Sequence, residues 1–390
     1  MGSPDLSEER SALGRSLLAR GAMAPDWRAA FEAVPRSAFL PEVIWPYDME
    51  SGTHVTVDLR DEPGLWFQYA DADVPVVTQW DDGKPAGDGA RVPTSSASMP
   101  SVVFGMLADL DVEPGRTVLE IGTGTGWNAA LLSHRLGLDH VTTVEIDAKV
   151  ADTARDNLAA QNLLGTVLTR DGALGDPAGA PYDRIIATAG LRRIPTAWLE
   201  QLRPEGLIVA PWGTDYSNGD AIVRLARSEH GVEGRFTRPA EFMKLRAQRR
   251  SFAGHSAYVP DEGLAGADRS TTKVTEADLL GADRFDPRTF AIGLHVSSCY
   301  QVLATRRGAD RPVWFYGLDD RSWACVMFHE NRQAEVWQSG PRRLWTEVES
   351  ALSWWRDVGE PGYDRFGLTV TWDGEHRAWL DSPEKCWPVM

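Results

Sequence analysis

The chain has 390 residues, and its 43% hydrophobic and 9% aromatic content supports ordinary globular cores, enough for two domains. Its formal net charge of −16 argues against an enzyme that acts on nucleic acid, because phosphate binding draws on clustered lysines and arginines. The three cysteines are far apart and suggest neither a disulfide framework nor a zinc site, and the scattered histidines suggest no metal. No stretch is long and apolar enough to span a membrane, so we expect a cytoplasmic protein with no membrane partner.

The first hundred residues predict helices followed by a loop-rich segment. Hydrophobic periodicity indicates two amphipathic helices within residues 5–34, and Pro35 ends the second. Residues 50–97 are rich in Asp, Gly, Pro and Thr, which is typical of loops with short strands. A further helix is expected over residues 101–110.

A glycine-rich turn lies at residues 118–128, Val-Leu-Glu-Ile-Gly-Thr-Gly-Thr-Gly-Trp-Asn, between a predicted buried strand and a helix. Such a turn lets the backbone approach a ligand closely, and the free N–H groups of the helix face that ligand. The next strand ends at Glu145, where a carboxylate can accept hydrogen bonds from a ribose diol. A third strand is followed by Asp171 and Gly172, which can reach an adenine ring. A glycine triplet alone also occurs in plain strand-to-helix connections, but these three strand ends together indicate a nucleoside site.

Strands and helices alternate from residue 116 to 250. Residues 184–189 and 206–213 are the fourth and fifth predicted strands, with a short helix between them. The alternation predicts an α/β fold with a mostly parallel sheet, helices on both faces, and ligands at the carboxyl ends of the strands.

The spacing Glu-x-Gly-x-Gly-x-Gly differs from the dinucleotide pattern and resembles the nucleoside-binding turn of S-adenosylmethionine-dependent methyltransferases. The resemblance implies a class I, Rossmann-like methyltransferase fold with S-adenosyl-L-methionine as cofactor and S-adenosyl-L-homocysteine as product. It assigns cofactor binding to Glu120, Gly122, Thr123, Gly124, Gly126, Asn128, Glu145, Ile146, Asp171 and Gly172. Within this set, Glu120 is expected to brace the glycine turn rather than to touch the methyl group.

A series of motifs between about residues 8 and 250 is similar to the protein-L-isoaspartate O-methyltransferases. Residues 30–41, Ala-Phe-Glu-Ala-Val-Pro-Arg-Ser-Ala-Phe-Leu-Pro, look like the N-terminal signature of that family. Residues 95–100 resemble its Thr-Ile-Ser-Gln/Ala-Pro loop, whose serine faces the cofactor methyl and the substrate carboxylate. The resemblance implies that Ser98 has this catalytic role and that Ser96 stands where the family has Thr, whereas Met99 departs from the pattern. The alternative is that Ser98 only caps the next helix.

Two features lie outside that resemblance. Residues 79–93 are longer than expected for the family, and a long loop beside an active site often gates a substrate. After Arg250 the chain holds nine of its sixteen tryptophans, which suits a peptide-binding cleft or a small mixed core. The predicted regions are an N-terminal helical and substrate-loop region, a cofactor-binding core, a linker and an α+β C-terminal domain for peptide recognition, at residues 1–100, 101–251, 252–272 and 273–390.

The C-terminal motifs, such as Gly-Pro-Arg-Arg-Leu-Trp at residues 340–345, look like those of methyltransferase homologues from actinobacterial peptide-maturation systems, mainly ATP-grasp (graspetide) and also lanthipeptide clusters. This resemblance implies methylation of an Asp side chain in a modified precursor peptide, closure of the ester to an aspartimide, and a companion ATP-grasp ligase. The alternatives are an isoaspartyl repair enzyme with an accessory domain and a cofactor-binding scaffold without catalysis.

A basic run after residue 234 either attracts an acidic peptide or is a solvated surface. It consists of Arg235, Arg238, Lys244, Arg246, Arg249 and Arg250.

Overall fold

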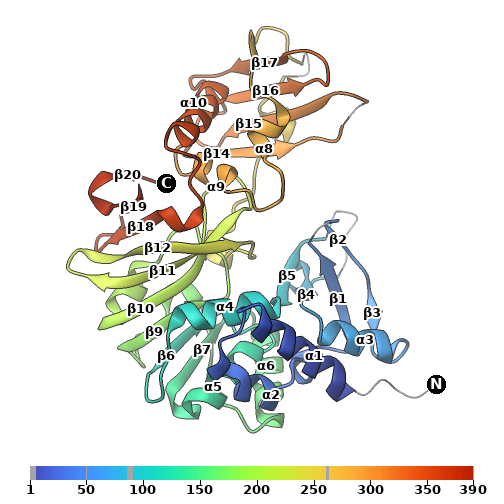
Figure 1. Ribbon diagram of the computed structural model, residues 1–390, viewed down its shortest axis with the longest axis vertical. Coiled ribbons are helices and arrows are strands. Elements are labelled where there is room, and N and C mark those ends of the chain that lie inside the picture. Colours follow the sequence, from blue (N-terminus) through green and yellow to red (C-terminus); the bar gives the residue numbers. More distant parts are fainter. Residues whose placement is uncertain (1–5, 50, 86–90, 261–262, 307, 390) are drawn as a thin grey trace.

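The computed structural model describes residues 6–49, 51–85, 91–260, 263–306 and 308–389. A ten-stranded sheet forms its centre (Figure 1). In spatial order its strands are β20 (Cys386–Pro388), β19 (His376–Leu380), β18 (Phe366–Thr371), β12 (Gly231–Ala240), β11 (Asp220–Ser228), β10 (Leu202–Trp212), β9 (Tyr182–Ala187), β6 (Val118–Ile121), β7 (Val141–Glu145) and β8 (Thr166–Thr169). The half from β10 to β8 is parallel, and the half from β10 to β20 is antiparallel. The predicted parallel sheet is therefore present, extended by antiparallel strands.

Helices cover both faces of this sheet because side chains alternate along each strand. One face packs against α1 (Leu6–Ala19), α2 (Arg28–Ala33), α4 (Pro100–Leu110) and α5 (Trp127–Leu136). The other face packs against α7 (Thr196–Glu200) and α9 (Pro287–Gly293). At the parallel edge, α6 (Ala148–Ala160) contacts β7 and β8. Among the described helices, none has the length and apolarity needed to cross a lipid bilayer.

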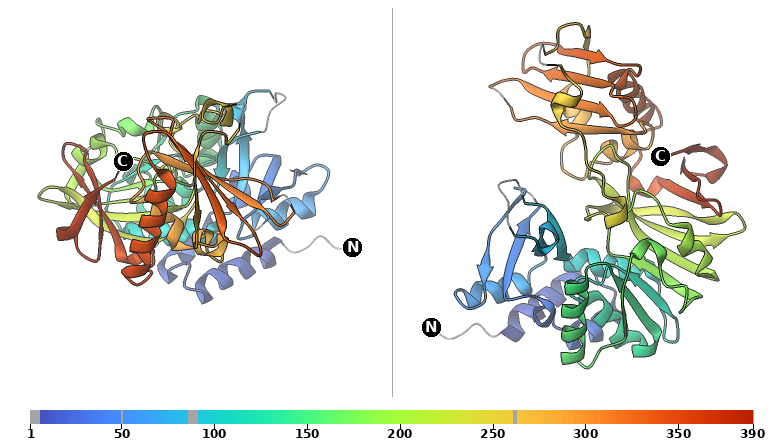
Figure 2. Two further views of the ribbon diagram at one scale, coloured as in Figure 1. Left: turned by 90° about the horizontal axis from the view of Figure 1, so that it is seen from above. Right: turned by 180° about the vertical axis from the view of Figure 1, so that it is seen from behind.

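An antiparallel N-terminal sheet stands beside the central sheet (Figures 1 and 2). Its strands are β2 (Thr53–His54), β1 (Val43–Asp48), β4 (Val76–Trp80) and β5 (Pro93–Ala97), with β3 (Val57–Asp58) paired to β1 and α3 (Pro63–Ala70) packed below. The segment predicted to be loop-rich is thus more ordered than expected. Of the predicted gating loop, residues 79–80 end β4, residue 93 begins β5, and residues 86–90 lie outside the described residues.

A second antiparallel sheet forms most of the C-terminal region. Its order is β13 (Asp268–Thr272), β17 (Ala334–Ser339), β16 (Trp323–Phe328), β15 (Arg311–Gly317) and β14 (Cys299–Leu303), accompanied by α8 (Glu276–Leu280) and α10 (Leu344–Asp357). The strand pairing cuts across the predicted division of the chain, because β13 falls within residues 252–272 and β18 to β20 belong to the central sheet. The division into four regions stays a prediction.

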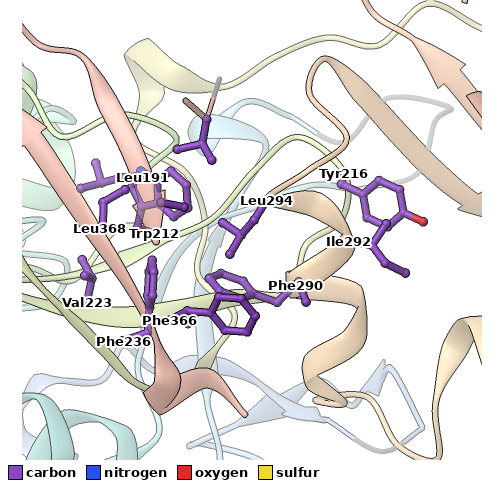
Figure 3. Close-up of a cluster of buried hydrophobic side chains, with 14 of the residues drawn as sticks. Leu191, Trp212, Tyr216, Val223, Phe236, Phe290, Ile292, Leu294, Phe366 and Leu368 are labelled. Carbon is purple, nitrogen blue, oxygen red and sulfur yellow. The ribbon is translucent and has the colours of Figure 1, made fainter. Parts of the chain in front are cut away.

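The C-terminal region shares a hydrophobic core with the central sheet, as Figure 3 shows. The ring of Phe290 on α9 lies 4.9 Å from that of Phe236 on β12 and 6.2 Å from that of Phe366 on β18, measured between centroids. All three side chains are almost completely buried. The region after residue 250 is therefore part of the body that carries the parallel strands.

Candidate active site

A pocket opens at the carboxyl ends of the parallel strands and contains about 940 Å³ of unfilled space, its open mouth included. Its lining comes from the loop before α4, from the segments at the carboxyl ends of β6 to β9, and from residues 243–246 with Arg249. Ten predicted site residues line it: Ser96, Ser98, Gly122, Thr123, Gly124, Asn128, Glu145, Ile146, Asp171 and Gly172. The structure thus brings together strand ends that are far apart in the sequence. Glu120 and Gly126 do not line the pocket.

The backbone of the glycine turn packs closely against the segment that follows β9. Gly122 has a φ of +98°, and a Cβ atom there would lie 2.9 Å from the Oγ1 atom of Thr188. The Thr188 hydroxyl in turn donates a 2.6 Å hydrogen bond to the carbonyl oxygen of Gly122. Only glycine fits this position without strain or displacement of Thr188. Thr188 also lines the pocket, although no motif of the sequence marks it as a site residue.

Glu145 is held at the end of β7 by two backbone donors. Its carboxylate accepts hydrogen bonds from the N–H of Gly124 at 3.0 Å and of Asp147 at 3.1 Å. Burial raises the pKa of Glu145, and these hydrogen bonds oppose the shift. A carboxylate can accept about four hydrogen bonds, so it retains acceptor positions for a ligand. Beside it, Ile146 exposes 37% of its surface on the pocket wall, an apolar contact suited to a flat ring.

Glu120 lies beneath the turn and is completely buried. Its carboxyl accepts hydrogen bonds from Asn128 in the first turn of α5 and from Thr143 on β7. Burial raises the pKa of Glu120 to about 7. The oxygens of Glu120 are directed at protein groups and the residue does not line the pocket, which suits the bracing role expected of it rather than a direct contact with the cofactor. Gly126 immediately precedes α5 and lies against α6, where a Cβ atom would be 3.3 Å from the side chain of Leu158.

Asp171 and Gly172 follow β8 and line the pocket. The Asp171 carboxylate accepts a 2.9 Å hydrogen bond from the N–H of Ala173, so one oxygen orders the following turn. A Cβ atom on Gly172 would lie 2.5 Å from Ile121, so the backbone there packs directly on β6. The carbonyl oxygen of Gly172 accepts a 2.9 Å hydrogen bond from the indole of Trp198. These contacts fix the backbone beside Asp171.

The serine loop, residues 95–98, also lines the pocket. Ser96 belongs to β5 and pairs with Val77, and Ser98 follows the strand. The residue before α4 is Met99, and no side chain caps this helix, so Ser98 is not its cap. Among the described residues the Ser98 hydroxyl has no protein hydrogen-bond partner, and it lines the pocket, so it is free to contact a ligand.

Arg36 anchors this loop from below, although in the sequence it stands out only as part of a motif. Its buried guanidinium donates to the backbone carbonyl oxygens of Ala70, Ala72, Val74, Ala97 and Ser98. It also stacks over the ring of Trp127, which begins α5. Burial lowers the pKa of Arg36 to about 10, so it stays charged at neutral pH. One side chain therefore ties the serine loop to the helix that follows the glycine turn.

The basic run is not a free basic surface. Each of its members binds acidic side chains or backbone carbonyl oxygens: Arg235 with the carbonyls of residues 364, 365 and 381, Arg238 with Asp109, Lys244 with Asp220, Arg246 with Asp82 and Asp147, Arg249 with Asp82, and Arg250 with Asp215. Three members nevertheless line the pocket, namely Lys244, Arg246 and Arg249. Together with Asp82, the two arginines connect the turn after β4 to this part of the pocket lining.

Comparison with known proteins matches this arrangement to one family. The family model described as Protein-L-isoaspartate(D-aspartate) O-methyltransferase (PCMT) matches residues 69–249. A protein-L-isoaspartate O-methyltransferase of Rhodopseudomonas palustris is 35% identical over 214 residues, which cover 55% of this chain and 81% of that protein. One of Methylorubrum extorquens is 32% identical over 244 residues, which cover 62% of this chain and 90% of its own.

A solved structure named protein-L-isoaspartate O-methyltransferase has a similar fold. The TM-score is 0.54 at 18% sequence identity, over 96% of this chain and 100% of the other. At that identity the similarity concerns the fold alone. Because it covers nearly the whole chain, it includes most of the region after Arg250.

Proposed function

Since this chain belongs to the protein-L-isoaspartate O-methyltransferase family and is an S-adenosyl-L-methionine-dependent protein carboxyl O-methyltransferase, we propose that its acceptor is the free carboxylate of an isoaspartyl residue in a protein or peptide. The fold is the class I methyltransferase fold expected from the sequence, with an additional C-terminal region. The observation that carries the proposal is that Ser98, whose hydroxyl has no hydrogen-bond partner among the described residues, lines the same pocket as the glycine turn.

The pocket fits the cofactor of this family. A Cβ atom on Gly122 would press on Thr188, which also lines the pocket, so a side chain at residue 122 would disturb the glycine turn and the pocket lining together. We assign the ribose to Glu145, the adenine to the wall formed by Ile146 and Asp171, and the amino-acid end to the turn at Thr123 and Gly124. When bound, the cofactor supplies an electrophilic methyl group.

The protein's own contribution is to orient the acceptor and to remove water from it. A carboxylate is already ionised at neutral pH, so its attack on a methyl group needs no strong general base. Ser98 would hold the acceptor carboxylate through its hydroxyl, and Ser96 lines the same pocket. The rate then depends on how well the acceptor carboxylate is aligned with the methyl group and on the exclusion of water. Arg36 supports this alignment because its buried guanidinium fixes the backbone of the serine loop at Ser98.

The ester would be an intermediate in repair. The backbone nitrogen of the next residue attacks the ester carbonyl, a C–N bond forms, and methanol leaves to give a succinimide. Hydrolysis of that ring opens it to aspartate or isoaspartate. This last chemistry takes place in the peptide and needs no further group from the enzyme.

The test is methyl transfer from labelled S-adenosyl-L-methionine to an isoaspartyl peptide and to the same peptide with ordinary aspartate. We expect transfer to the isoaspartyl peptide alone, and a loss of about tenfold or more in kcat for Ser98→Ala with unchanged S-adenosyl-L-homocysteine binding. Ser101→Ala, on α4 beyond the loop, is the matched control. Wild-type rates in Ser98→Ala would refute the assignment of this serine.

A second candidate is methylation of an Asp side chain in a ribosomally synthesised, modified peptide, with closure to an aspartimide and an ATP-grasp ligase as companion. Its support is the resemblance of residues 340–345 and a stacked aromatic pair that includes an exposed ring, close in the sequence to the pocket-lining residue Arg249. Phe252, three residues after Arg249, is 44% exposed and stacks on Tyr300 of β14 with ring centroids 4.4 Å apart. Aromatic side chains of this kind are suited to gripping a peptide.

The presence of a C-terminal region does not by itself favour this second candidate, because the fold of the solved structure named protein-L-isoaspartate O-methyltransferase aligns over 96% of this chain. A cross-linked precursor peptide with a target Asp, incubated beside the isoaspartyl peptide, separates the two candidates. Methyl transfer to the precursor peptide alone supports the second candidate. Cofactor binding without transfer to any acidic peptide would leave only the scaffold alternative.

A further inference from the structure

Lys244 lines the pocket. Its segment runs alongside Gly190, whose N–H donates to the carbonyl oxygen of Met243 at 2.8 Å, and the N–H of Leu245 donates back to Gly190 at 2.9 Å. Gly190 continues from the end of β9, whereas the proposed nucleoside contacts follow β6, β7 and β8. A Cβ atom on Gly190 would lie 2.9 Å from the Nζ atom of Lys244. The ammonium therefore lies beside the segment that follows β9.

The ammonium is held in place but not saturated. Nζ binds the carboxylate of Asp220 and lies 3.3 Å from the carbonyl oxygen of Phe242. An ammonium has three donors, and within the described part of the chain these are its two partners. Its side chain retains 13% exposure, and it lines the pocket. One donor direction is thus open to a ligand.

The charges behind Lys244 leave it effectively cationic. Asp220 is completely buried and also binds Arg192 at 3.2 Å, so its single negative charge is shared between two cations. Arg192 also forms an ion pair with Asp215, and Asp215 forms another with Arg250. This connected network contains three cations and two carboxylates. In a partly buried site, the remaining positive charge favours an anionic ligand.

We propose that Lys244 receives the methyl-accepting carboxylate of the peptide, beside Ser98. This inference rests on the proposed function, because it assumes a carboxylate acceptor. On methyl transfer the carboxylate oxygen bonds to the methyl carbon, the methyl–sulfur bond of the cofactor breaks, and the acceptor becomes a neutral ester. The ester lacks the charge that Lys244 binds, so the same cation that favours substrate binding favours release of product.

The experiment measures binding, so it does not depend on turnover. Fluorescently labelled isoaspartyl peptide and its carboxamide analogue, in which an amide replaces the free carboxylate, are titrated into the enzyme loaded with S-adenosyl-L-homocysteine. The wild type should bind the carboxylate peptide about tenfold or more tightly than the carboxamide, as expected for a charge-assisted hydrogen bond. Lys244→Gln should reduce this preference to about twofold or less.

Two further variants keep the result interpretable. Lys244→Gln leaves Asp220 with one partner fewer, so Lys244→Gln/Asp220→Asn removes both charges and should show the same lost preference in a folded protein. Lys385→Gln, at an exposed lysine remote from the pocket, should keep the wild-type preference. If the Lys244 variants lose affinity for both peptides by the same factor, the preference for the carboxylate persists. Lys244 is then only a structural ion-pair partner, and the inference is wrong. If the wild type itself shows no preference and methylates no isoaspartyl peptide, the proposed function fails instead.

Discussion

The guanidinium of Arg36 donates a 3.1 Å hydrogen bond to the backbone carbonyl oxygen of Ser98, although 62 positions separate the two residues in the sequence. A second bond, of 2.9 Å, goes to the carbonyl oxygen of Ala97. The conformation of the serine loop therefore depends on a side chain from the N-terminal helices. The same guanidinium stacks over Trp127, so the loop and the cofactor side of the pocket share one anchor.

Arg36→Lys should misplace the serine loop while keeping a positive charge. A lysine cannot reach five carbonyl oxygens spread around a planar guanidinium, and buried carbonyls without donors cost about 1–3 kcal/mol each. We expect a lower Tm and a kcat reduced by about tenfold or more at temperatures where the variant is folded, with S-adenosyl-L-homocysteine affinity little changed. Steady-state kinetics and calorimetry provide the measurements. Arg15→Lys on the exposed face of α1 is the control, and unchanged kcat in Arg36→Lys would contradict the anchoring role.

Gly122→Ala should selectively weaken cofactor binding. The alanine would have to adopt a φ near +98° and its Cβ would press on Thr188, so the turn must shift. We expect the Kd for S-adenosyl-L-homocysteine, measured by titration calorimetry, to rise by about tenfold or more. Gly64→Ala has an open position with nothing within 4 Å and should leave the Kd unchanged. Wild-type affinity in Gly122→Ala would mean that this turn does not bind the cofactor.

Glu120→Gln should change how stability depends on pH. Burial raises the pKa of Glu120 from its ordinary value of 4.5 to about 7, so the folded state holds a proton that the unfolded state has already lost across this interval. The contribution of Glu120 to stability is therefore full below pH 4.5 and falls as the pH rises through about 7.

Glutamine removes this titration and keeps an oxygen for Asn128. Relative to the wild type, the variant should gain stability as the pH increases from about 5 to 8, by on the order of 3 kcal/mol at most. Denaturant unfolding at several pH values measures the difference. A difference that does not vary with pH would show that the carboxyl is not protonated in the folded state.

Phe290→Ala should destabilise the methyltransferase core, although the residue lies outside the stretch matched by the family model. Its ring is 2% exposed and packs on Phe236 of β12, so its removal leaves a cavity between α9 and the central sheet, with an expected loss of about 3–5 kcal/mol. Chemical denaturation provides the measurement. Phe252→Ala, at a ring that is 44% exposed, should cost much less. Equal effects would mean that the C-terminal region does not stabilise the core.

The sequence by itself determined the parallel half of the sheet and the cofactor side of the pocket. Buried strands, glycine turns and strand-end acids are local patterns, and the carboxyl ends of parallel strands meet at one edge of a sheet. These patterns alone therefore predict that Gly122, Glu145 and Asp171 lie together, and all three line the pocket. The resemblance to one family added Ser98, which lies on the pocket wall.

Only the tertiary structure decided that Lys244 lines the pocket, that Arg36 holds the serine loop, and where the core ends. Lys244 became a pocket residue because its segment runs along Gly190, and Arg36 became an anchor because five carbonyls from distant turns converge on it. The addition of β18 to β12, and the burial of Phe290 against both, likewise join segments that are far apart in the sequence. Such contacts leave no periodic pattern or motif in the sequence. They form between surfaces that are still exposed after the sheet and its helices have packed.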